Sequence, residues 1–207
     1  MSVSVLTPDA PGALDAAAAA IADGRVVGVP TETVYGLAVL PAQGPLEALV
    51  AVKGRDPGKG IALLVDGLDQ LTGVVVVPAG AARLAERFWP GALTLVLPVR
   101  EGLDLPALLT GGRRTLGVRL PDHPVPRTLA RRLGPLAVSS ANRTGQPDAR
   151  TAAELVEAVG DGVRLVIDDG PVRGGQASSV VGFAADGAME VFREGAIDRA
   201  TLERALG

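Results

Sequence analysis

Apolar and polar positions alternate along the chain with two different periods. Apolar residues at helical spacing predict helices, and these lie at 12–24, 45–55, 79–88, 124–134, 151–162 and 196–207. Short apolar runs predict strands at 25–30, 61–67, 92–99, 115–121, 136–141, 163–170, 178–183 and 188–195. Strands that alternate with helices are typical of an α/β fold with a largely buried sheet. Because the last three strands follow one another without helices, we expect a mixed sheet that is antiparallel in part.

Polar side chains collect where these strands and helices end. They are Thr31, Lys53, Arg55, Arg119, Ser140, Asn142 and Ser178. Open α/β sheets bind ligands at such strand ends, so we expect a ligand site there. One helix start is also marked, because Thr151 followed by Glu154 three residues later forms a capping box.

Length and composition narrow the interpretation. The 207 residues predict a single domain over residues 1–207. With 47% hydrophobic but only 2% aromatic residues, its core must be built from Val, Leu and Ala. A net charge of −3 predicts no general attraction to nucleic acid, so any anion site must be local. The absence of Cys and the single His exclude disulfides, thiolate catalysis and zinc sites built on Cys or several His.

The first residues lack the basic start and apolar run of a signal peptide. The alanine run at 16–20 is followed by Asp23 and Gly24 and is too short to span a bilayer. We therefore expect a cytoplasmic protein that has no membrane segment.

A basic, glycine-rich turn, KGRDPGKG at 53–60, is the first candidate for anion binding. Glycine permits close backbone approach, and Lys53, Arg55 and Lys59 can neutralise phosphate. The turn is not a Walker loop, because it has one residue too few between its glycines and Gly60 stands where Ser or Thr would hold magnesium. An ordinary solvated basic loop is the alternative.

Further segments combine a strand end with polar side chains. Arg119 ends the strand in TLGVRLPDHP and can take a carboxylate through two hydrogen bonds. We interpret Ser140 and Asn142 in AVSSANRTGQP as hydrogen-bonding groups, because no GxSxG motif supports a nucleophile. Ser178 follows two glycines, and Arg193 ends the VFREG strand. Each segment also has a structural alternative, namely a surface charge, strand-end capping or a hairpin turn.

Two residues are given structural roles. His123 follows Asp122 in a loop, which favours helix entry or hydrogen bonding over service as a catalytic base. Trp89 is the only Trp, and we expect it to pack in the core or at its rim.

The order of these segments is more specific than any one of them. PTETVYGL, KGR, FWPGALTLVL, VRLPDHP, SSANRTGQP, SSVV and REGAI follow one another over almost the whole chain. In this order they resemble the YrdC-like threonylcarbamoyladenylate synthase family. The resemblance implies a twisted mixed parallel and antiparallel sheet flanked by helices, with a large concave, positively charged central pocket. It also implies condensation of L-threonine, bicarbonate and ATP into threonylcarbamoyl-AMP, with release of pyrophosphate.

The resemblance assigns roles to single residues. Threonine contacts fall on Thr31, Arg119, Ser140 and Ser178, and Arg119 takes the threonine carboxylate. Contacts to ATP fall on Lys53, Arg55, Lys59, Thr115, Asn142 and Arg193. Ser179 forms a pair with Ser178. No conventional base is implied, and Lys53 and Arg55 act as charge stabilisers. The implied cofactor is Mg²⁺ that accompanies ATP, with no protein ligand and no organic cofactor.

Departures from the family pattern are also visible. Lys59 stands where the long branch of the family usually has Asn, the His that the long branch carries shortly after the basic turn is missing, and REG replaces the usual RPG. The first two features point to the short, single-domain bacterial branch. The sequence ends at Gly207 without the extra C-terminal domain of the long branch, so pocket closure is left open. Downstream proteins that transfer the threonylcarbamoyl group to tRNA are implied as partners, and weak tRNA binding is left open.

Three other functions are considered besides threonylcarbamoyladenylate synthesis. An RNA- or tRNA-binding module is disfavoured by the pI of about 5.2 and by the lack of a basic stripe. A carbamoyl-adenylate domain of hydrogenase maturation would belong to a much longer chain with Cys-containing zinc modules. A family paralogue that acts on another small substrate is disfavoured by PTET and SSAN.

Overall fold

The computed structural model describes residues 3–207, and its ten strands form one sheet in the order β1-β8-β2-β3-β7-β4-β6-β5-β9-β10. The strands are β1 Ser4–Leu6, β2 Val27–Val29, β3 Gly36–Val39, β4 Ala62–Leu64, β5 Leu93–Pro98, β6 Thr115–Arg119, β7 Leu136–Ser140, β8 Leu165–Ile167, β9 Ser179–Phe183 and β10 Met189–Arg193. The α-helices are α1 Ala13–Ala22, α2 Gln43–Lys53, α3 Ala79–Phe88, α4 Ala107–Thr110, α5 Pro124–Leu133, α6 Ala152–Val159 and α7 Arg199–Leu206. Short 3-10 helices span Leu68–Leu71 and Gly160–Gly162.

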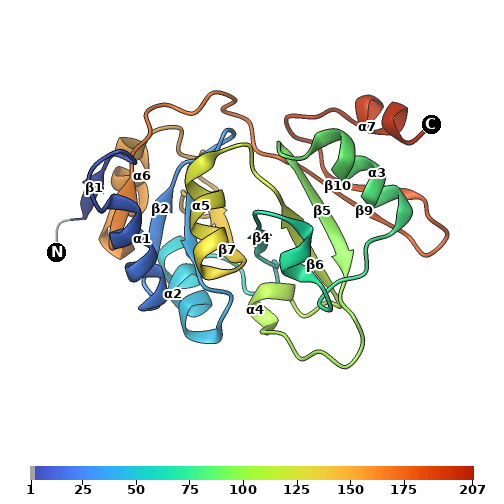
Figure 1. Cartoon of the computed structure of the whole chain (residues 1–207), viewed down its shortest axis with the longest axis horizontal. Coiled ribbons are helices and arrows are strands. Elements are labelled where there is room, and N and C mark those ends of the chain that lie inside the picture. The colour runs from blue at the N-terminus through green and yellow to red at the C-terminus, as the bar shows by residue number, and fades with distance from the viewer. Residues whose placement is uncertain (1–2) are drawn as a thin grey trace.

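The sheet is mixed, as predicted. Strands β1 and β2 pair with β8 in parallel, as β4 does with β6 and β5 with β9. The pairs β2–β3, β3–β7, β4–β7, β5–β6 and β9–β10 are antiparallel. Figure 1 shows the sheet crossing the molecule, with β1 near one end and β10 near the other.

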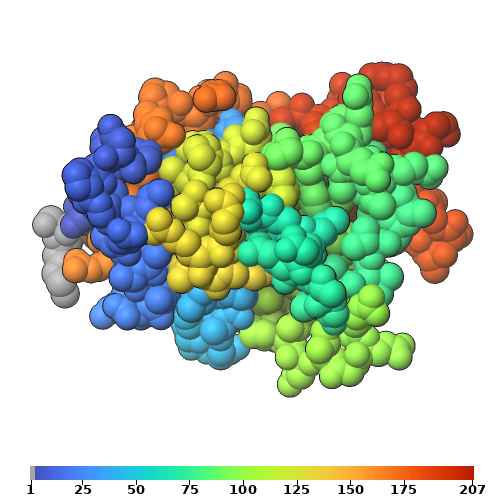
Figure 2. All heavy atoms as spheres, in the orientation of Figure 1, coloured from blue at the N-terminus to red at the C-terminus, as the bar shows by residue number. Residues whose placement is uncertain are grey.

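Two hydrophobic clusters cover the sheet. One joins α1 and α5 through residues such as Ile21 and Leu129, and the other gathers α2, α3, α6 and α7. Successive residues of β3 belong to different clusters, since Leu37 is in the second and Ala38 in the first, as expected for a strand buried on both faces. In Figure 2, α5 and α1 cover much of the near face.

Some elements differ from the sequence-based prediction. Strands β1 and β3 were not predicted, because each is a short apolar segment of three or four residues. Of the last three strands, β9 and β10 form an antiparallel hairpin, whereas β8 lies between β1 and β2 and is parallel to both. Thr151 caps α6 as predicted, but Glu154 Oε2 accepts from the backbone N–H of Arg150 and not from that of Thr151.

The helices of residues 3–207 are all too short or too polar to cross a bilayer.

Candidate active site

A cavity of about 660 Å³ lies against the sheet, from β3 and β7 at its centre to β10 at its edge. This volume is within the range of roughly 300–1,000 Å³ that small-molecule sites occupy. The sequence-predicted residues that line it are Thr31, Arg55, Lys59, Thr115, Arg119, Ser140, Ser178 and Arg193. Lys53 and Asn142 do not line it.

Lys53 lies behind the cavity wall. Helix α2 ends at this residue because Gly54 adopts the left-handed conformation, with φ 61°. The Lys53 side chain is buried, and its Nζ donates to the carbonyl oxygens of Ser140 (2.6 Å) and Asn142 (2.9 Å) and contacts Asn142 Oδ1. An ammonium has three N–H donors, so these protein oxygens use its whole hydrogen-bonding capacity.

Neither Lys53 nor Asn142 lines the cavity, and their contact with ATP stays a prediction. Asn142 Nδ2 donates to the carbonyl of Gln146, and the backbone N–H of Thr144 donates to the Lys53 carbonyl (3.0 Å). Burial and the nearby Arg55 lower the pKa of Lys53 to about 8, while Asp148 opposes this shift. Among Lys53, Ser140 and Asn142, only Ser140 lines the cavity.

Arg55, Lys59 and Gly60 of the basic turn line the cavity. Arg55 donates from Nη2 to the Gly60 carbonyl (2.6 Å) and from Nε to the Lys59 carbonyl (3.1 Å), which holds the turn closed. Arg113 was not predicted, yet it also lines the cavity and donates to the Gly58 carbonyl (3.1 Å). Three cations thus gather at one end of the cavity.

Glycine explains how Arg113 reaches the basic turn. Gly111 has φ 64°, and a Cβ there would lie 2.6 Å from the Gly58 carbonyl oxygen and 2.7 Å from the Gly60 nitrogen. Only glycine fits this close approach. The GGRR segment carried the signal for Arg113, because two glycines beside two arginines repeat the composition of the basic turn.

Arg119 is the most buried cation of the cavity lining, with 6% of its surface exposed. Its Nη2 donates to Glu32 Oε1 (2.6 Å) and its Nε to the Gly91 carbonyl (3.0 Å). The other carboxylate oxygen, Glu32 Oε2, is buried and has no hydrogen-bond partner among the described residues. Glu32 therefore orients the guanidinium, and the Nη1 side makes no hydrogen bond within residues 3–207.

Thr31 lines the cavity, but its hydroxyl is engaged within its own turn. Oγ1 donates to the Val34 carbonyl (2.6 Å) and accepts from the backbone N–H groups of Thr33 and Val34 (3.2 Å each). The Thr33 hydroxyl lies 2.9 Å away. These contacts form a side-chain-stabilised turn, and contact of the Thr31 hydroxyl with threonine stays a prediction.

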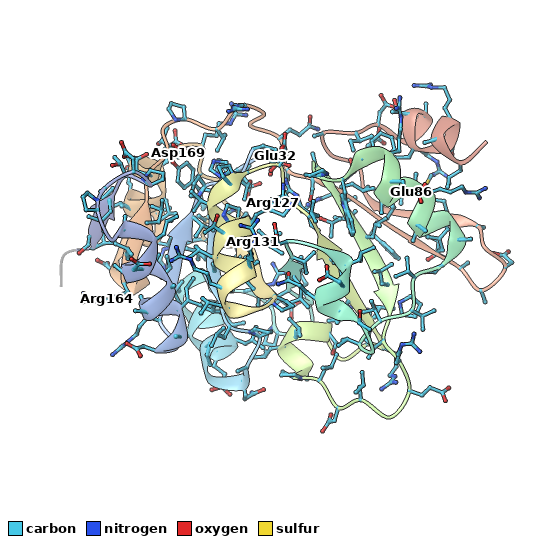
Figure 3. The ribbon with its side chains drawn as sticks, viewed as in Figure 1. Glu32, Glu86, Arg127, Arg131, Arg164 and Asp169 are labelled. Atoms are coloured by element: carbon cyan, nitrogen blue, oxygen red, sulfur yellow. The ribbon has the colours of Figure 1, made fainter. Side chains whose placement is uncertain are left out.

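The Tyr35 hydroxyl connects this segment to the end of β8. It donates to the Gly170 carbonyl (2.7 Å) and accepts from the backbone N–H of Asp169 (3.2 Å). Burial raises the pKa of Tyr35, so the phenol stays protonated. His123 caps α5 by accepting from the Val125 N–H and lies 3.3 Å from Asp169 Oδ2, which confirms its role at the helix entry. Glu32 and Asp169 lie at the same upper edge in Figure 3.

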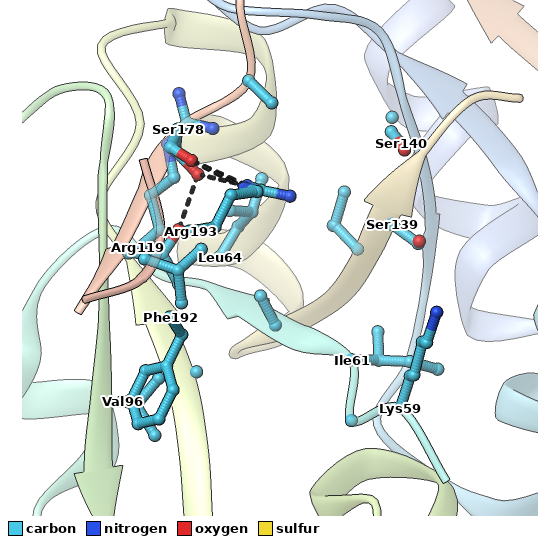
Figure 4. A pocket seen from close by; sticks show the side chains of 18 of the residues that line it. Lys59, Ile61, Leu64, Val96, Arg119, Ser139, Ser140, Ser178, Phe192 and Arg193 are labelled. Atoms are coloured by element: carbon cyan, nitrogen blue, oxygen red, sulfur yellow. Dashed lines mark hydrogen bonds between the residues drawn. The ribbon is translucent and has the colours of Figure 1, made fainter. Parts of the chain in front are cut away.

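Near β5, β9 and β10, the cavity is lined by two hydroxyl side chains, Thr94 and Ser178, and by a further arginine, Arg193. Ser178 Oγ lies 2.8 Å from Thr94 Oγ1, and Arg193 donates from Nη2 to both the Ser178 carbonyl (2.7 Å) and its hydroxyl (3.2 Å) (Figure 4). Thr94 was missed because it stands inside the apolar run LTLVLP. Ser179 does not reach the cavity; its hydroxyl donates to the Ile197 carbonyl and accepts from the Gly195 and Ile197 N–H groups.

Trp89 and possible metal ligands were also considered in the sequence analysis. Trp89 is half-buried, packs against the larger cluster and donates from its indole to the Leu93 carbonyl (2.7 Å), as predicted for a packing residue. Within residues 3–207 no group of three His, Cys, Asp or Glu side chains could hold a metal ion, and the lining residues include no carboxylate.

Comparison with known proteins identifies the family. A family model for the Sua5, YciO and YrdC proteins, described as "Telomere recombination", matches residues 19–195. The chain belongs to the Sua5/YciO/YrdC family. The resemblance stated from the sequence is thereby confirmed, and all the residues that line the cavity lie inside the matched segment.

Individual members of the Sua5/YciO/YrdC family give the extent of the similarity. The threonylcarbamoyl-AMP synthase of Idiomarina loihiensis is 41% identical over 162 residues, which is 75% of this chain and 84% of that protein. The enzyme of the same name from Bacillus subtilis is 34% identical over 92% of this chain, which spans only 56% of the relative's length. The structure of Pyrococcus abyssi Sua5 complexed with L-threonine superposes with a TM-score of 0.90 at 31% identity, over 100% of this chain and 61% of that one.

Proposed function

We propose that this member of the Sua5/YciO/YrdC family is an L-threonylcarbamoyladenylate synthase, a nucleotidyltransferase. It condenses L-threonine, bicarbonate and ATP to threonylcarbamoyl-AMP and releases pyrophosphate. The relatives named threonylcarbamoyl-AMP synthase and the Sua5 structure complexed with L-threonine support this assignment.

The observation that carries the proposal is the charge of the cavity. Arg55, Lys59, Arg113, Arg119 and Arg193 line it, and no carboxylate does. The whole chain has a net charge of −3, so these cations are concentrated where they can bind anions. All three proposed substrates carry negative groups, and ATP carries several.

The two ends of the cavity suit different substrates. The turn with Arg55, Lys59 and Arg113 suits the polyphosphate of ATP. Arg119, which Glu32 orients, suits the carboxylate of threonine. With no base assigned, the rate enhancement comes from positioning the reactants and neutralising their charge.

Mg²⁺ enters this proposal as part of the MgATP substrate, with no ligand from the protein. The product is consumed by proteins that transfer the threonylcarbamoyl group to tRNA, and the cytoplasm is the compartment where ATP and tRNA meet. An RNA-binding module is the second candidate, but the cations that line a cavity fit a small anion better than an extended nucleic-acid backbone.

Pyrophosphate release from ATP tests the proposal. Four reactions contain ATP and Mg²⁺ alone, with threonine, with bicarbonate, and with both, in buffer stripped of carbon dioxide. We expect release well above background only when both are present, and L-serine should replace threonine poorly. Release that ignores threonine or bicarbonate would contradict the proposal, and tight tRNA binding without any release would favour the RNA-binding alternative.

A further inference from the structure

A second, smaller pocket lies beside the cavity and is formed by the connection between β5 and β6. Its volume is about 200 Å³, and its lining comes entirely from residues 99–114. Helix α4 belongs to this connection and lies near the lower edge of Figure 1. None of the residues that the family resemblance assigns to threonine or ATP lines this second pocket.

A thin partition separates the second pocket from the cavity. Thr110 and Arg113 line both of them. Between these two residues stand Gly111 and Gly112, which adopt left-handed backbone with φ of 64° and 73° and add no side chain to the partition. The one hydrogen bond that the Arg113 side chain makes within residues 3–207 runs from Nη1 to the Gly58 carbonyl (3.1 Å). An exposed guanidinium held by a single contact can turn to either side of the partition.

The second pocket has an excess of positive charge. Arg113 and Arg114 line it together with one carboxylate, that of Asp104. Arg114 donates from Nη1 to the Leu103 carbonyl (3.0 Å) and from Nη2 to the Arg100 carbonyl (2.7 Å), which holds the connection folded. Because a guanidinium has five N–H groups, both arginines keep several donors that no described residue accepts.

We propose that the second pocket is a binding site for pyrophosphate, which it receives as this anion leaves the cavity. The inference rests on the proposed function, in which pyrophosphate is released from ATP. It adds a site outside the cavity, on the far side of Arg113 from the residues that bind the substrates.

Size and location both favour pyrophosphate. A volume of about 200 Å³ is below the range of roughly 300–1,000 Å³ for sites of drug-sized ligands, so it suits a small anion and not a nucleotide. Pyrophosphate is released beside Arg55, Lys59 and Arg113, which places it next to the partition. Two guanidinium groups offer the paired N–H donors that phosphate oxygens accept, and an anion with two phosphates can contact both.

Asp104 makes the second pocket a weak site. Its carboxylate is exposed and forms no ion pair with the described residues, so it opposes an anion in the pocket. Weak binding suits a product that must leave the enzyme. Asp104 also provides a test of opposite sign to Arg114, because removing the carboxylate should tighten the binding that removing the guanidinium weakens.

Calorimetric titration of sodium pyrophosphate into enzyme saturated with a non-hydrolysable ATP analogue tests the proposal. The analogue fills the end of the cavity where Arg55 and Lys59 lie, so pyrophosphate can bind only elsewhere. We expect one pyrophosphate to bind per chain, with a Kd on the order of 1 mM, and sulfate and orthophosphate to bind about tenfold more weakly.

Two variants and two matched controls assign the binding to the second pocket. Asp104→Asn should lower the Kd for pyrophosphate about threefold and Arg114→Met should raise it about threefold, while the affinity for the analogue stays at the wild-type value. Asp161→Asn and Arg25→Met make the same changes at exposed positions that line neither the cavity nor the second pocket, and should leave the Kd unchanged.

The outcomes that would overturn the inference are specific. Loss of pyrophosphate binding once the analogue is bound would confine pyrophosphate to the cavity, and equal binding of sulfate would make the two arginines an unselective anion patch. Because Arg114→Met also removes two contacts to carbonyl oxygens, Asp104→Asn decides if that variant does not fold, and a Kd that does not fall would overturn the inference. Failure of the proposed function appears differently, as wild-type protein that does not bind the analogue and whose pyrophosphate release does not depend on threonine and bicarbonate.

Discussion

The two ends of the basic turn place their cations in opposite environments. Lys53, at the end of α2, is buried and surrounded by oxygens of Ser140 and Asn142. Lys59, a few residues on, is exposed and lines the cavity. The first charge is satisfied by the protein itself, and the second is left for a ligand. A basic motif therefore indicates that an anion site is near, but it does not indicate which of its cations contacts the anion.

The largest expected effect is that of Lys53→Met. The Ser140 and Asn142 carbonyls and Asn142 Oδ1 would lose a charged donor in a buried place. We expect the free energy of unfolding in urea to fall by roughly 3 kcal/mol or more, with turnover falling too because Ser140 loses its position. Lys59→Met should leave the unfolding free energy within about 0.5 kcal/mol. Equal stability of the two variants would contradict the buried, structural role of Lys53.

Arg119 is an intermediate case, because Glu32 holds one part of its guanidinium and the cavity receives the rest. Arg119→Ala should raise the KM for threonine about tenfold to a hundredfold, with ATP affinity measured by calorimetry changed by about twofold or less. The variant also leaves the Glu32 carboxylate buried and unpaired. The double variant Glu32→Gln, Arg119→Ala should therefore regain stability without regaining threonine affinity. Normal threonine binding in either variant would remove Arg119 from the threonine site.

Lys59 and Arg113 are the cations of the cavity that are left for a ligand. Both are exposed lining residues. Replacing either with Met should weaken ATP about fivefold while AMP changes little, because the missing charge serves the β- and γ-phosphates. The loss should shrink at high ionic strength, as for any solvent-exposed charge. Calorimetric titrations with both nucleotides at two salt concentrations check this, and an equal loss for ATP and AMP would contradict it.

Thr31, like Lys53, has its polar group bound by the protein itself, but it carries no charge. We therefore expect the substitution of Thr31 to have the smallest effect of those considered. Its hydroxyl is used inside the turn by Thr33 and Val34. Thr31→Val should lower the free energy of unfolding by roughly 1–2 kcal/mol and leave the ranking of threonine over serine and valine unchanged. Thr31→Ser should retain most of the stability. A change of substrate preference without loss of stability would instead support direct contact between Thr31 and threonine.

The sequence predicted the elements whose signals are local. The amphipathic spacing of α3 and α5 and the apolar runs of β5 and β7 were sufficient for this. Strand β3 was not predicted, because GLAV is too short to show a period and acquires its strand geometry from β2 and β7 on either side. The position of β8 between β1 and β2 depends on pairing between distant segments, which no local pattern encodes.

Site residues in local motifs were likewise predicted, and those that depend on distant contacts were not. The family resemblance identified eight of the residues that line the cavity, because they stand in recognisable motifs. It could not show that Lys53 is enclosed by oxygens of Ser140 and Asn142 and does not line the cavity, since that depends on where α2 ends. Arg113 reaches the cavity only through the close approach of Gly111 to Gly58 and Gly60, and Thr94 only through the pairing of β5 with β9. Such contacts arise from the tertiary structure.

The ratio of ATP to AMP affinity, measured by calorimetry in Lys53→Gln and Lys59→Gln, tests the central distinction most directly. If position relative to the cavity decides the role of each cation, the ratio falls in Lys59→Gln and stays at the wild-type value in Lys53→Gln, whatever happens to the stability of the latter. A ratio that falls in Lys53→Gln and not in Lys59→Gln would mean that Lys53 leaves Ser140 and Asn142 to bind the phosphates, and the distinction drawn from the structure would be wrong.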